Sequence, residues 1–461
     1  MNAATTGRSD IAPTQALADF TRSLSWPDVP AVIRHAARRN LVNVLACALG
    51  GRADPAIAAF STALAPMAGA AIATEIGADR TDAGTAAFIN AAAANVHDFD
   101  DQHLPTVMHP GPVVVAAALA AAELTGAKGE HLLTGIIAGI EVACRIGNAA
   151  SPGHYAAGFH ITATCGVFGA AAATASILRL DAARVVWAIG HAASQSAGLV
   201  EALGAASKST GVGAAARGGL QAALFAAAGI AGPAAPLEGQ FGFLSVMAPA
   251  ADAGQITAEL GTRWEILRNA PKAYPVGVVL HPVVDACLAL LKLDGFTLDK
   301  LSRLELRGHP MLRMRADRPD IRTGREATVS AQHVAAAALL KGGVGPAELT
   351  DAAVEHTEIR ALRSRIFVRD DADCRVEAVT LLAESTCGTA WRVHVPMARG
   401  LPDRPLSDAE LNAKAGLLIG LGAPWCDPHG VLQLAWGAED LPSLAPLSAV
   451  LRRDGPLRVI P

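Results

Sequence analysis

The sequence predicts a mainly helical protein, with a large all-helical domain and a smaller α+β lid domain inserted near its C-terminal end. Apolar residues spaced three or four positions apart recur through the first 260 or so residues, as in amphipathic helices. Alternating apolar and polar residues become common only after about residue 265, and a helical pattern returns after residue 405. We therefore place the helical domain at residues 1–268 and 405–461 and the lid domain at residues 269–404.

The first clear helix is expected between Ala31 and Leu49, because its apolar side chains recur at helical spacing and Gly50 and Gly51 follow as a stop signal. Further helical stretches are separated by glycine and proline rather than by strand patterns. They are expected at Glu130–Ile146, Ala182–Ile189, Leu199–Leu203 and Gly218–Ala228.

The lid domain is predicted from segments with the two-residue period of half-buried strands. These segments are Leu301–Arg307, Arg365–Arg369, Val376–Leu382 and Trp391–Val395. Helices are expected between them at Pro282–Leu291 and Ser330–Leu340, and helix returns from Ser407 on. Two bodies arranged in this way are expected to leave a cleft, which is a preferred place for a small-molecule site.

Composition excludes several classes of function. The 461 residues are 51% apolar and 17% charged, and 38 basic against 42 acidic residues give a net charge of −4. There is no basic excess to neutralise nucleic-acid phosphates. No stretch of roughly 18 strongly apolar residues, no apolar signal peptide and no CxxC pair is apparent. We expect a soluble, cytoplasmic protein that binds neither nucleic acid nor membranes.

The segment from Asn95 to Pro110 holds the densest cluster of ionisable side chains. Six of them fall within 13 residues, namely His97, Asp98, Asp100, Asp101, His103 and His109. Acid–base chemistry is the favoured interpretation, because close carboxylates and imidazoles shift one another's pKa values. A metal site for zinc, iron or manganese is a second interpretation. The third is a solvated loop leading into a helix near Pro112.

Three further positions carry chemistry that small anionic substrates need. His160 stands just ahead of an alanine-rich helix with Thr162 and Thr164, where the end of a helix favours a carboxylate. Lys208 is flanked by hydroxyls and glycines, although an exposed loop lysine is the simpler reading. A proline-rich turn is able to aim Lys272 and His281 into the cleft, with a surface turn as the alternative.

Five motifs in order resemble the MmgE/PrpD family. They are the DFDD…HP segment (Asp98–Pro110), GFHxTxTxGxFGAAAA (Gly158–Ala173), the lysine before an Ala/Gly helix (Lys208), PLEGxxGF (Pro236–Phe243) and KxYP…H…DA (Lys272–Ala286). The C-terminal PLSDAELNAKAG is similar to the family's ending as well. The resemblance implies a helical domain with a smaller α+β lid, a homodimer, and no metal or organic cofactor.

Carried over residue by residue, the resemblance places Asp98, His109, His160, Lys208 and His281 in the active site. Side chains that it, together with the motifs, suggests for substrate binding are Gln102, Thr162, Thr164, Lys272, Tyr274 and His333. The sequence also departs from the family pattern. Gln102 stands where threonine is frequent, His333 where tyrosine is frequent, Gly277 where cysteine is common and Asn43 where aspartate is common.

The family includes 2-methylcitrate dehydratase, cis-aconitate decarboxylase and iminodisuccinate epimerase, whose reactions share a carbanion or enolate beside a carboxylate. Such an intermediate needs a proton carrier, here His109 or His160, with Asp98 as orienting group or base. Cations such as Lys208 would bind substrate carboxylates. We expect first a lyase that dehydrates a small di- or tricarboxylate such as 2-methylcitrate. Epimerase and decarboxylase are the alternatives within the family; a metal-dependent hydrolase and a non-catalytic binding protein are those outside it.

Overall fold

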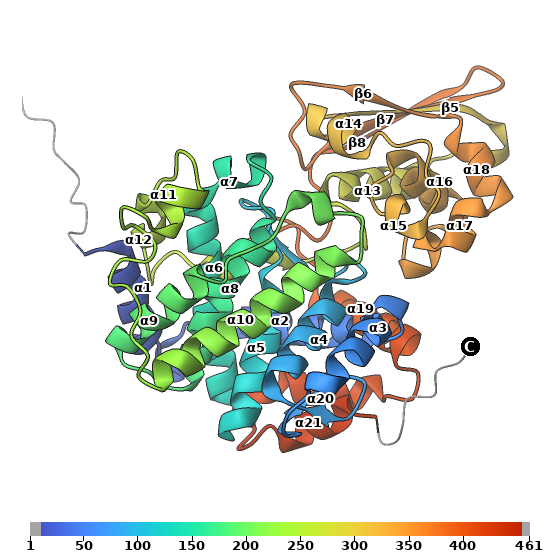
Figure 1. Cartoon of the computed structure of the whole chain (residues 1–461). Coiled ribbons are helices and arrows are strands. Elements are labelled where there is room, and N and C mark those ends of the chain that lie inside the picture. The colour runs from blue at the N-terminus through green and yellow to red at the C-terminus, as the bar shows by residue number, and fades with distance from the viewer. Residues whose placement is uncertain (1–10, 454–461) are drawn as a thin grey trace, which may run out of the picture. The chain divides into compact units, whose positions relative to one another are not determined.

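The computed structural model describes residues 11–453 (Figure 1), so the opening decapeptide, in which no signal peptide is expected, lies outside it. The chain divides into two compact units. Unit 1 comprises the chain up to residue 96, residues 100–270 and the chain from residue 408 on. Unit 2 comprises residues 97–99 and 271–407, so it interrupts the sequence of unit 1. Unit 2 also takes in the short piece at residues 97–99, which no pattern in the sequence indicated.

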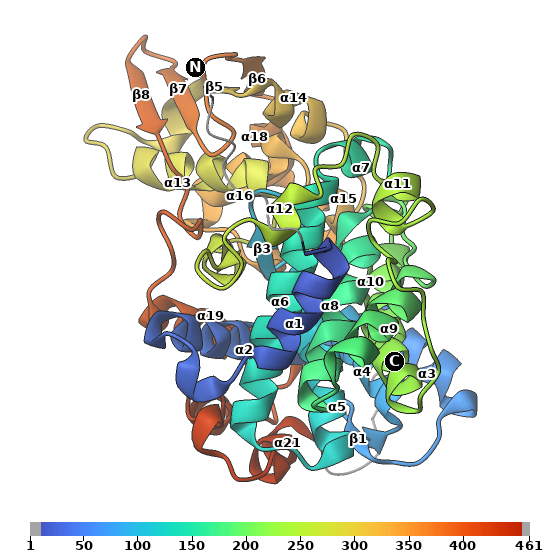
Figure 2. The same cartoon turned by 90° about the vertical axis from the view of Figure 1, so that its left-hand side faces the viewer.

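Unit 1 is built almost entirely of helices (Figure 1). The long ones are α2 (Ala31–Gly51), α4 (Ala83–Asn95), α5 (Pro110–Thr125), α6 (Gly129–Ala150), α8 (Ile161–Ile177) and α10 (Ser207–Ala227). The shorter ones are α1 (Pro13–Ser23), α3 (Pro55–Leu64), α7 (Gly153–Ala156), α9 (Ala182–Ala193), α11 (Phe243–Met247), α12 (Gly254–Thr257), α19 (Asp408–Gly422), α20 (Pro428–Trp436) and α21 (Ala445–Leu451). Helix α1 packs across α6, α8 and α9 (Figure 2).

Helix α8 is the centre of unit 1, because it packs against α5, α6 and α10 and nearly all its side chains are buried. Small residues allow these helices to approach closely. A Cβ atom added to Gly139 of α6 would lie 2.6 Å from the carbonyl oxygen of Gly169 in α8, and the reverse substitution gives the same distance. The alanine and glycine of this sequence are therefore a packing requirement, since larger side chains would hold the helix axes apart.

Helix α6 is also long and apolar enough to cross a membrane, and the bent pair of α2 with the chain to Met67 would pass the same test as one span. However, 94% of the apolar window in α6 is buried within the protein. Core helices of soluble proteins have this character, so the length and composition of α6 are explained by its place in unit 1.

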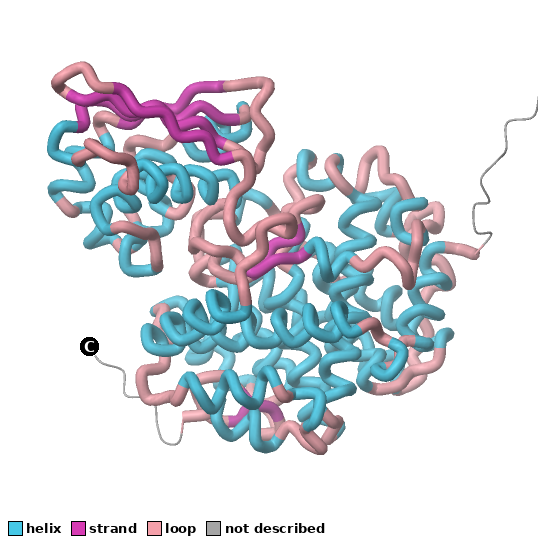
Figure 3. The backbone as a smooth tube through the Cα atoms, turned by 180° about the vertical axis from the view of Figure 1, so that it is seen from behind, coloured by secondary structure: helices cyan, strands magenta, loops and turns pink. Residues whose placement is uncertain are grey.

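Unit 2 combines a four-stranded sheet with helices (Figure 3). The strands are β5 (Leu301–Gly308), β6 (Ile366–Asp370), β7 (Val379–Ser385) and β8 (Ala390–Val395), in the order β6-β5-β7-β8. Strands β5 and β6 are parallel and the other pairs are antiparallel. The helices are α13 (His281–Leu290), α14 (Pro310–Ala316), α15 (Gly324–Ala327), α16 (Ala331–Lys341), α17 (Asp351–Glu355) and α18 (Thr357–Arg363).

One face of this sheet carries the core of unit 2. Leu304, Leu306 and Leu381 of the sheet pack with the buried apolar side chains of α13 and α16, such as Val283 and Val334. The alternation that predicted the strands is the signature of this half-buried sheet. Strand β7 begins at Val379, three residues later than expected.

Three expectations for unit 1 are wrong in detail. Leu199–Leu203 is not a helix beyond one 3-10 turn at Val200–Ala202. Helix α10 begins at Ser207 rather than at Gly218. The expected start relied on apolar side chains, but Gly213 is buried against Phe88 without one, so the first turns of the helix carry no apolar pattern. The first 260 residues are not purely helical either. They contain the strand pair β1 (Ala73–Thr74) with β2 (Arg80–Thr81), and β3 (Asp101–His103), which pairs with β4 (Asn269–Pro271).

A buried charge network holds β3 in unit 1. The carboxylate of Glu265 accepts hydrogen bonds from Nε2 of His103 at 3.1 Å, from Arg263 at 3.0 Å and from Arg268 at 3.1 Å. Burial alone would raise the pKa of Glu265, but the hydrogen bond and charge of His103, with the two arginines, lower it to about 2. Burial lowers the pKa of His103 itself.

The Glu265 network predicts a specific loss of stability in acid. Because the folded pKa is below the ordinary 4.5, Glu265 stabilises the fold above pH 4.5, and this contribution is lost as the pH falls towards 2. Glu265→Gln should lower the free energy of unfolding at pH 7 by about 3 kcal/mol, and the difference from the parent should shrink below pH 4.5. Urea unfolding from pH 7 to pH 3 measures this.

The control for this prediction is Glu259→Gln, since Glu259 pairs with the same Arg263 but its side chain is 67% exposed. That variant should unfold like the parent at each pH. Equal stability of Glu265→Gln and the parent at pH 7 would contradict the role of the network.

Candidate active site

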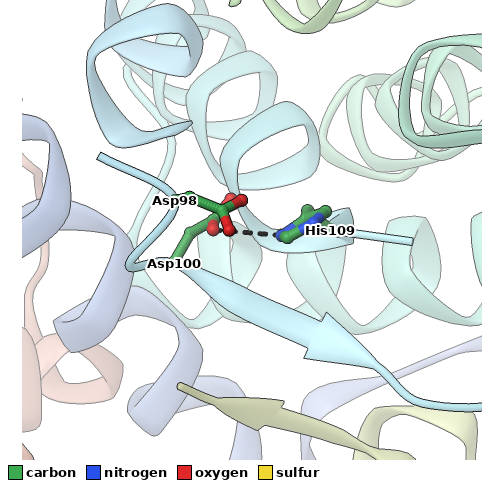
Figure 4. Close-up of side chains that lie close together, drawn as sticks. All are labelled: Asp98, Asp100 and His109. Carbon is green, nitrogen blue, oxygen red and sulfur yellow. Dashed lines mark hydrogen bonds and ion pairs between the residues drawn. The ribbon is translucent and has the colours of Figure 1, made fainter. Parts of the chain in front are cut away.

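His109 is the N-cap residue of α5 and is held at both its ring and its backbone. Its ring Nδ1 lies 3.0 Å from Oδ1 of Asp100 (Figure 4), and its amide N–H donates to the hydroxyl of Thr162 at 3.1 Å. The second oxygen of Asp100, Oδ2, accepts a hydrogen bond from the side-chain NH₂ group of Asn95 at 2.7 Å. Asn95 is the last residue of α4. The imidazole is only slightly exposed, and Asp100 is fully buried.

Asp101 secures the same end of α5. Its Oδ2 accepts the N–H of Gly111 at 3.0 Å and a hydrogen bond from the side chain of Asn269. A Cβ atom at Gly111 would lie 2.5 Å from this carboxyl, so only glycine fits there. Burial and the neighbouring charge of Asp100 raise the pKa of Asp101. The expected site residue Gln102 follows on β3 and is 7% exposed.

His160 is the N-cap residue of α8 and is buried. Its amide donates to the carbonyl of Gly198 at 3.1 Å, which ties the start of α8 to the loop before α10. Thr162 lies in the first turn of the same helix. Because Thr162 binds the His109 amide, the two histidines stand at the N-terminal ends of two packed helices, α5 and α8.

Thr164 does not lie at an open surface. It is fully buried, and its hydroxyl lies 2.6 Å from Nε2 of His154, whose Nδ1 donates to the carbonyl of Met247. The ring of His154 stacks on Phe159 with centroids 4.6 Å apart. Burial lowers the pKa of His154, so the ring is neutral. His154 was not expected from the sequence, because a single histidine between Gly153 and Tyr155 carries no pattern.

The sequence predicted that Lys208 would lie in a loop before a helix. In the structure it lies in the first turn of α10. It is half-buried. Helix α10 packs along α8, so Lys208 and His160 are both found near the starts of neighbouring helices of unit 1.

Unit 2 holds a second group of the expected residues. Lys272 is 2% exposed, and its Nζ donates to Oδ2 of Asp98 at 2.7 Å and to the Asp98 carbonyl at 3.1 Å. Asp98 has a φ of 52°, a left-handed conformation that aspartate tolerates better than most residues. The structure therefore brings together Lys272 and Asp98, which belong to separate motifs of the sequence.

His281 begins α13 and is 1% exposed. Burial and the charge of Lys272 lower the pKa of His281 to about 3, so the ring is neutral at physiological pH. Hydrogen bonding with the backbone of Arg399 and Val276 opposes this shift by raising the pKa, but the two lowering effects prevail. The ring of Tyr274 meets that of His281 edge to face, and the Tyr274 hydroxyl donates to Asp285 at 2.6 Å.

Two of the departures from the family pattern lie in packed interiors. His333 on α16 is fully buried in unit 2, and its Nε2 donates to the carbonyl of Glu348 at 2.8 Å. Asn43 on α2 is buried in unit 1 and accepts a hydrogen bond from Lys414 of α19 at 2.8 Å. Both side chains thus have structural partners of their own.

Comparison with known proteins agrees with the motifs. The model of the MmgE/PrpD N-terminal domain matches residues 15–255, and that of the MmgE/PrpD C-terminal domain matches residues 274–422. A cis-aconitate decarboxylase of Homo sapiens is 26% identical over 391 residues, which cover 81% of this chain and 80% of the relative. Those of Mus musculus and Aspergillus terreus are 26% identical and cover 71% and 59% of this chain, with 70% and 59% of the relatives' own lengths.

The metal-site interpretation is tested by the donor groups themselves. Asp98, Asp100 and His109 offer possible ligand atoms within 4.8 Å of one another (Figure 4). However, Asp98 is already paired with the ammonium of Lys272, and Asp100 with His109 and Asn95. A bound cation would have to compete with a buried lysine for one carboxylate, which disfavours a resident divalent metal.

We therefore expect chelation to leave the protein unchanged. Dialysis against EDTA should not shift the melting temperature or any carboxylate-dependent activity, because the Lys272 ammonium already pairs with Asp98, and Asn95 and His109 already occupy the oxygens of Asp100. Differential scanning fluorimetry and elemental analysis of the purified protein measure this. A melting temperature that falls on chelation and recovers with added zinc or manganese would instead support the metal-dependent interpretation.

Proposed function

Because the chain belongs to the MmgE/PrpD family, we propose that it is a lyase without metal or organic cofactor that decarboxylates a small unsaturated tricarboxylate of the cis-aconitate type. The observation that carries the proposal is the pair of buried histidines, His109 and His160, at the N-terminal ends of α5 and α8. Imidazoles supply protons near neutrality, and the positive ends of helix dipoles favour carboxylates.

The relatives change the order of the candidate reactions. Dehydration was the first expectation from the sequence, but the relatives reported above are named as decarboxylases. None of the three is named as an isomerase, so the comparisons lend epimerisation no support. Decarboxylation and dehydration use the same kind of carbanion. Which of the two occurs depends on whether the bound substrate aligns its carbon–carboxylate bond or its carbon–oxygen bond for cleavage.

In the proposed reaction, the bond between carbon and the leaving carboxylate breaks and carbon dioxide departs without the electron pair. That pair stays on carbon and spreads into the adjoining unsaturated acid. A protonated imidazole of His109 or His160 then delivers the proton that completes the product. Charged and polar donors stabilise the negative charge in the meantime.

Lys208, Lys272 and His281 are proposed to contact substrate carboxylates. Lys208 and Lys272 would do so as cations, although Lys272 is already partly neutralised by Asp98. His281 would act as a neutral N–H donor, because its pKa of about 3 leaves it uncharged at pH 7. The homodimer implied by the resemblance and the cytoplasmic location expected from the composition belong to the same proposal.

The substrate and the reaction are separated by one experiment. The protein is incubated in heavy water with cis-aconitate, citrate, 2-methylcitrate and substituted succinates, and the products are followed by NMR. We expect release of carbon dioxide with one deuterium incorporated at one end of the delocalised carbanion, either at the carbon that lost the carboxylate or at the far carbon of the original double bond. Loss of water would indicate a dehydratase, and deuterium exchange alone an epimerase. If no acid reacts or raises the melting temperature, the binding-protein alternative is favoured.

The histidine assignment gives a direct mutational prediction. His109→Ala and His160→Ala should each lower turnover at least about 100-fold, because the proton carrier is lost, while circular dichroism shows a retained fold. The matched control is His429→Ala, at an exposed position of unit 1. Near-parental turnover in both active-site variants would remove these histidines from the mechanism.

Lys208 gives a separate prediction for substrate binding. Lys208→Met should raise KM by about 10-fold or more with a smaller effect on kcat, because a charge-assisted hydrogen bond to a carboxylate is lost. Lys128→Met removes one positive charge from an exposed position of the same unit and should leave KM unchanged. An unaltered KM in Lys208→Met would show that this lysine binds no part of the substrate.

A further inference from the structure

We propose that Asp100 is a positioning residue that keeps the imidazole of His109 in the tautomer protonated at Nδ1, so that Nε2 carries the lone pair. The catalytic consequence rests on the proposed function; the tautomer itself does not. The neutral form of imidazole has one donor and one acceptor nitrogen, and the hydrogen bond at one nitrogen decides which is which.

The carboxyl of Asp100 is held as an acceptor on both oxygens. Oδ1 lies 3.0 Å from Nδ1 of His109, and Oδ2 lies 2.7 Å from the amide nitrogen of Asn95. Asp100 is fully buried and Asn95 is 1% exposed. Since an ionised carboxylate only accepts hydrogen bonds, His109 must donate from Nδ1.

The neighbouring Asp101 is the carboxyl of this buried pair that ionises less readily, which leaves Asp100 as the readier anion. Two adjacent buried carboxyls resist double ionisation. The raised pKa falls on Asp101, whose Oδ1 has no hydrogen-bond partner among residues 11–453. Asp100, with a donor on each oxygen, is the member that the surroundings stabilise as an anion.

The other side of His109 is fixed as well. The hydroxyl of Thr162 in α8 accepts the His109 amide, while Asp100 precedes β3 and Asn95 ends α4. Groups on two helices, α4 and α8, and on the loop between α4 and β3 therefore set the position of one histidine. Such an arrangement makes the orientation and protonation of the ring a property of the fold, before any substrate is bound.

Asp100→Asn is a sharp test because Asn95 dictates how the new amide must lie. The Asn95 amide nitrogen already donates towards this position, so the introduced side chain turns its oxygen to Asn95 and its NH₂ group to His109. Nδ1 must then accept, and the proton of the ring moves to Nε2. Rotating Asn95 instead would place its NH₂ group where its Oδ1 now lies without a partner, leaving buried donors unsatisfied.

The tautomer is read from ¹⁵N NMR of protein labelled at histidine, at a pH where the ring is neutral, with His109→Ala identifying the signals. We expect Nδ1 to be protonated in the parent and Nε2 in Asp100→Asn. With the acid that the parent converts, Asp100→Asn should lower kcat by about 100-fold or more and change KM by less than about 3-fold. The melting temperature should stay close to that of the parent, because the two side chains have the same shape.

The matched control is Asp101→Asn, which replaces the adjacent buried carboxyl by an amide without touching the ring. It should leave the proton of His109 on Nδ1. A parent protein with the proton on Nε2, or the same tautomer in the parent and Asp100→Asn, overturns the proposal without need of a substrate. A changed tautomer with parental kcat overturns it too. If the parent converts no acid, the proposed function fails while the tautomer measurement still decides this inference.

Discussion

The hydrogen bond from the His109 amide to the Thr162 hydroxyl joins the starts of two helices, and the rest of the candidate site in unit 1 is arranged around it. It sets the N-cap of α5 against the first turn of α8, which begins at Ile161 directly after the N-cap residue His160. Two buried imidazoles thereby occupy the electropositive ends of adjacent helices. An anionic substrate and its developing negative charge are suited to such surroundings.

This junction depends on how closely the helices of unit 1 approach. Gly139 and Gly169 bring the backbones of α6 and α8 into contact, and Gly111 lets the carboxyl of Asp101 reach the start of α5. The charged network around Glu265 then anchors β3, on which Asp101 lies, from its other end. Close packing and the charge network therefore both fix the position of β3.

The mainly helical character, most long helices and the strands of the C-terminal sheet were predictable, because three-to-four spacing and strand alternation follow burial directly. The start of α10 was not, since Gly213 is buried without an apolar side chain. The ionisable cluster was found by its density, but its internal roles were not. No spacing rule reveals that Asn95 and His109 bind Asp100, that Lys272 pairs with Asp98, or that His154 binds Thr164.

The glycines of this chain differ greatly in the substitutions that the surrounding structure allows. At Gly139 and Gly169 even one methyl group meets backbone, so neither position can drift unless the two helices separate. Gly416 and Gly420 of α19 have open space around them within the described chain. Among distant homologues we expect the first pair to remain fixed, while the second pair varies freely and gains helix propensity by changing to alanine.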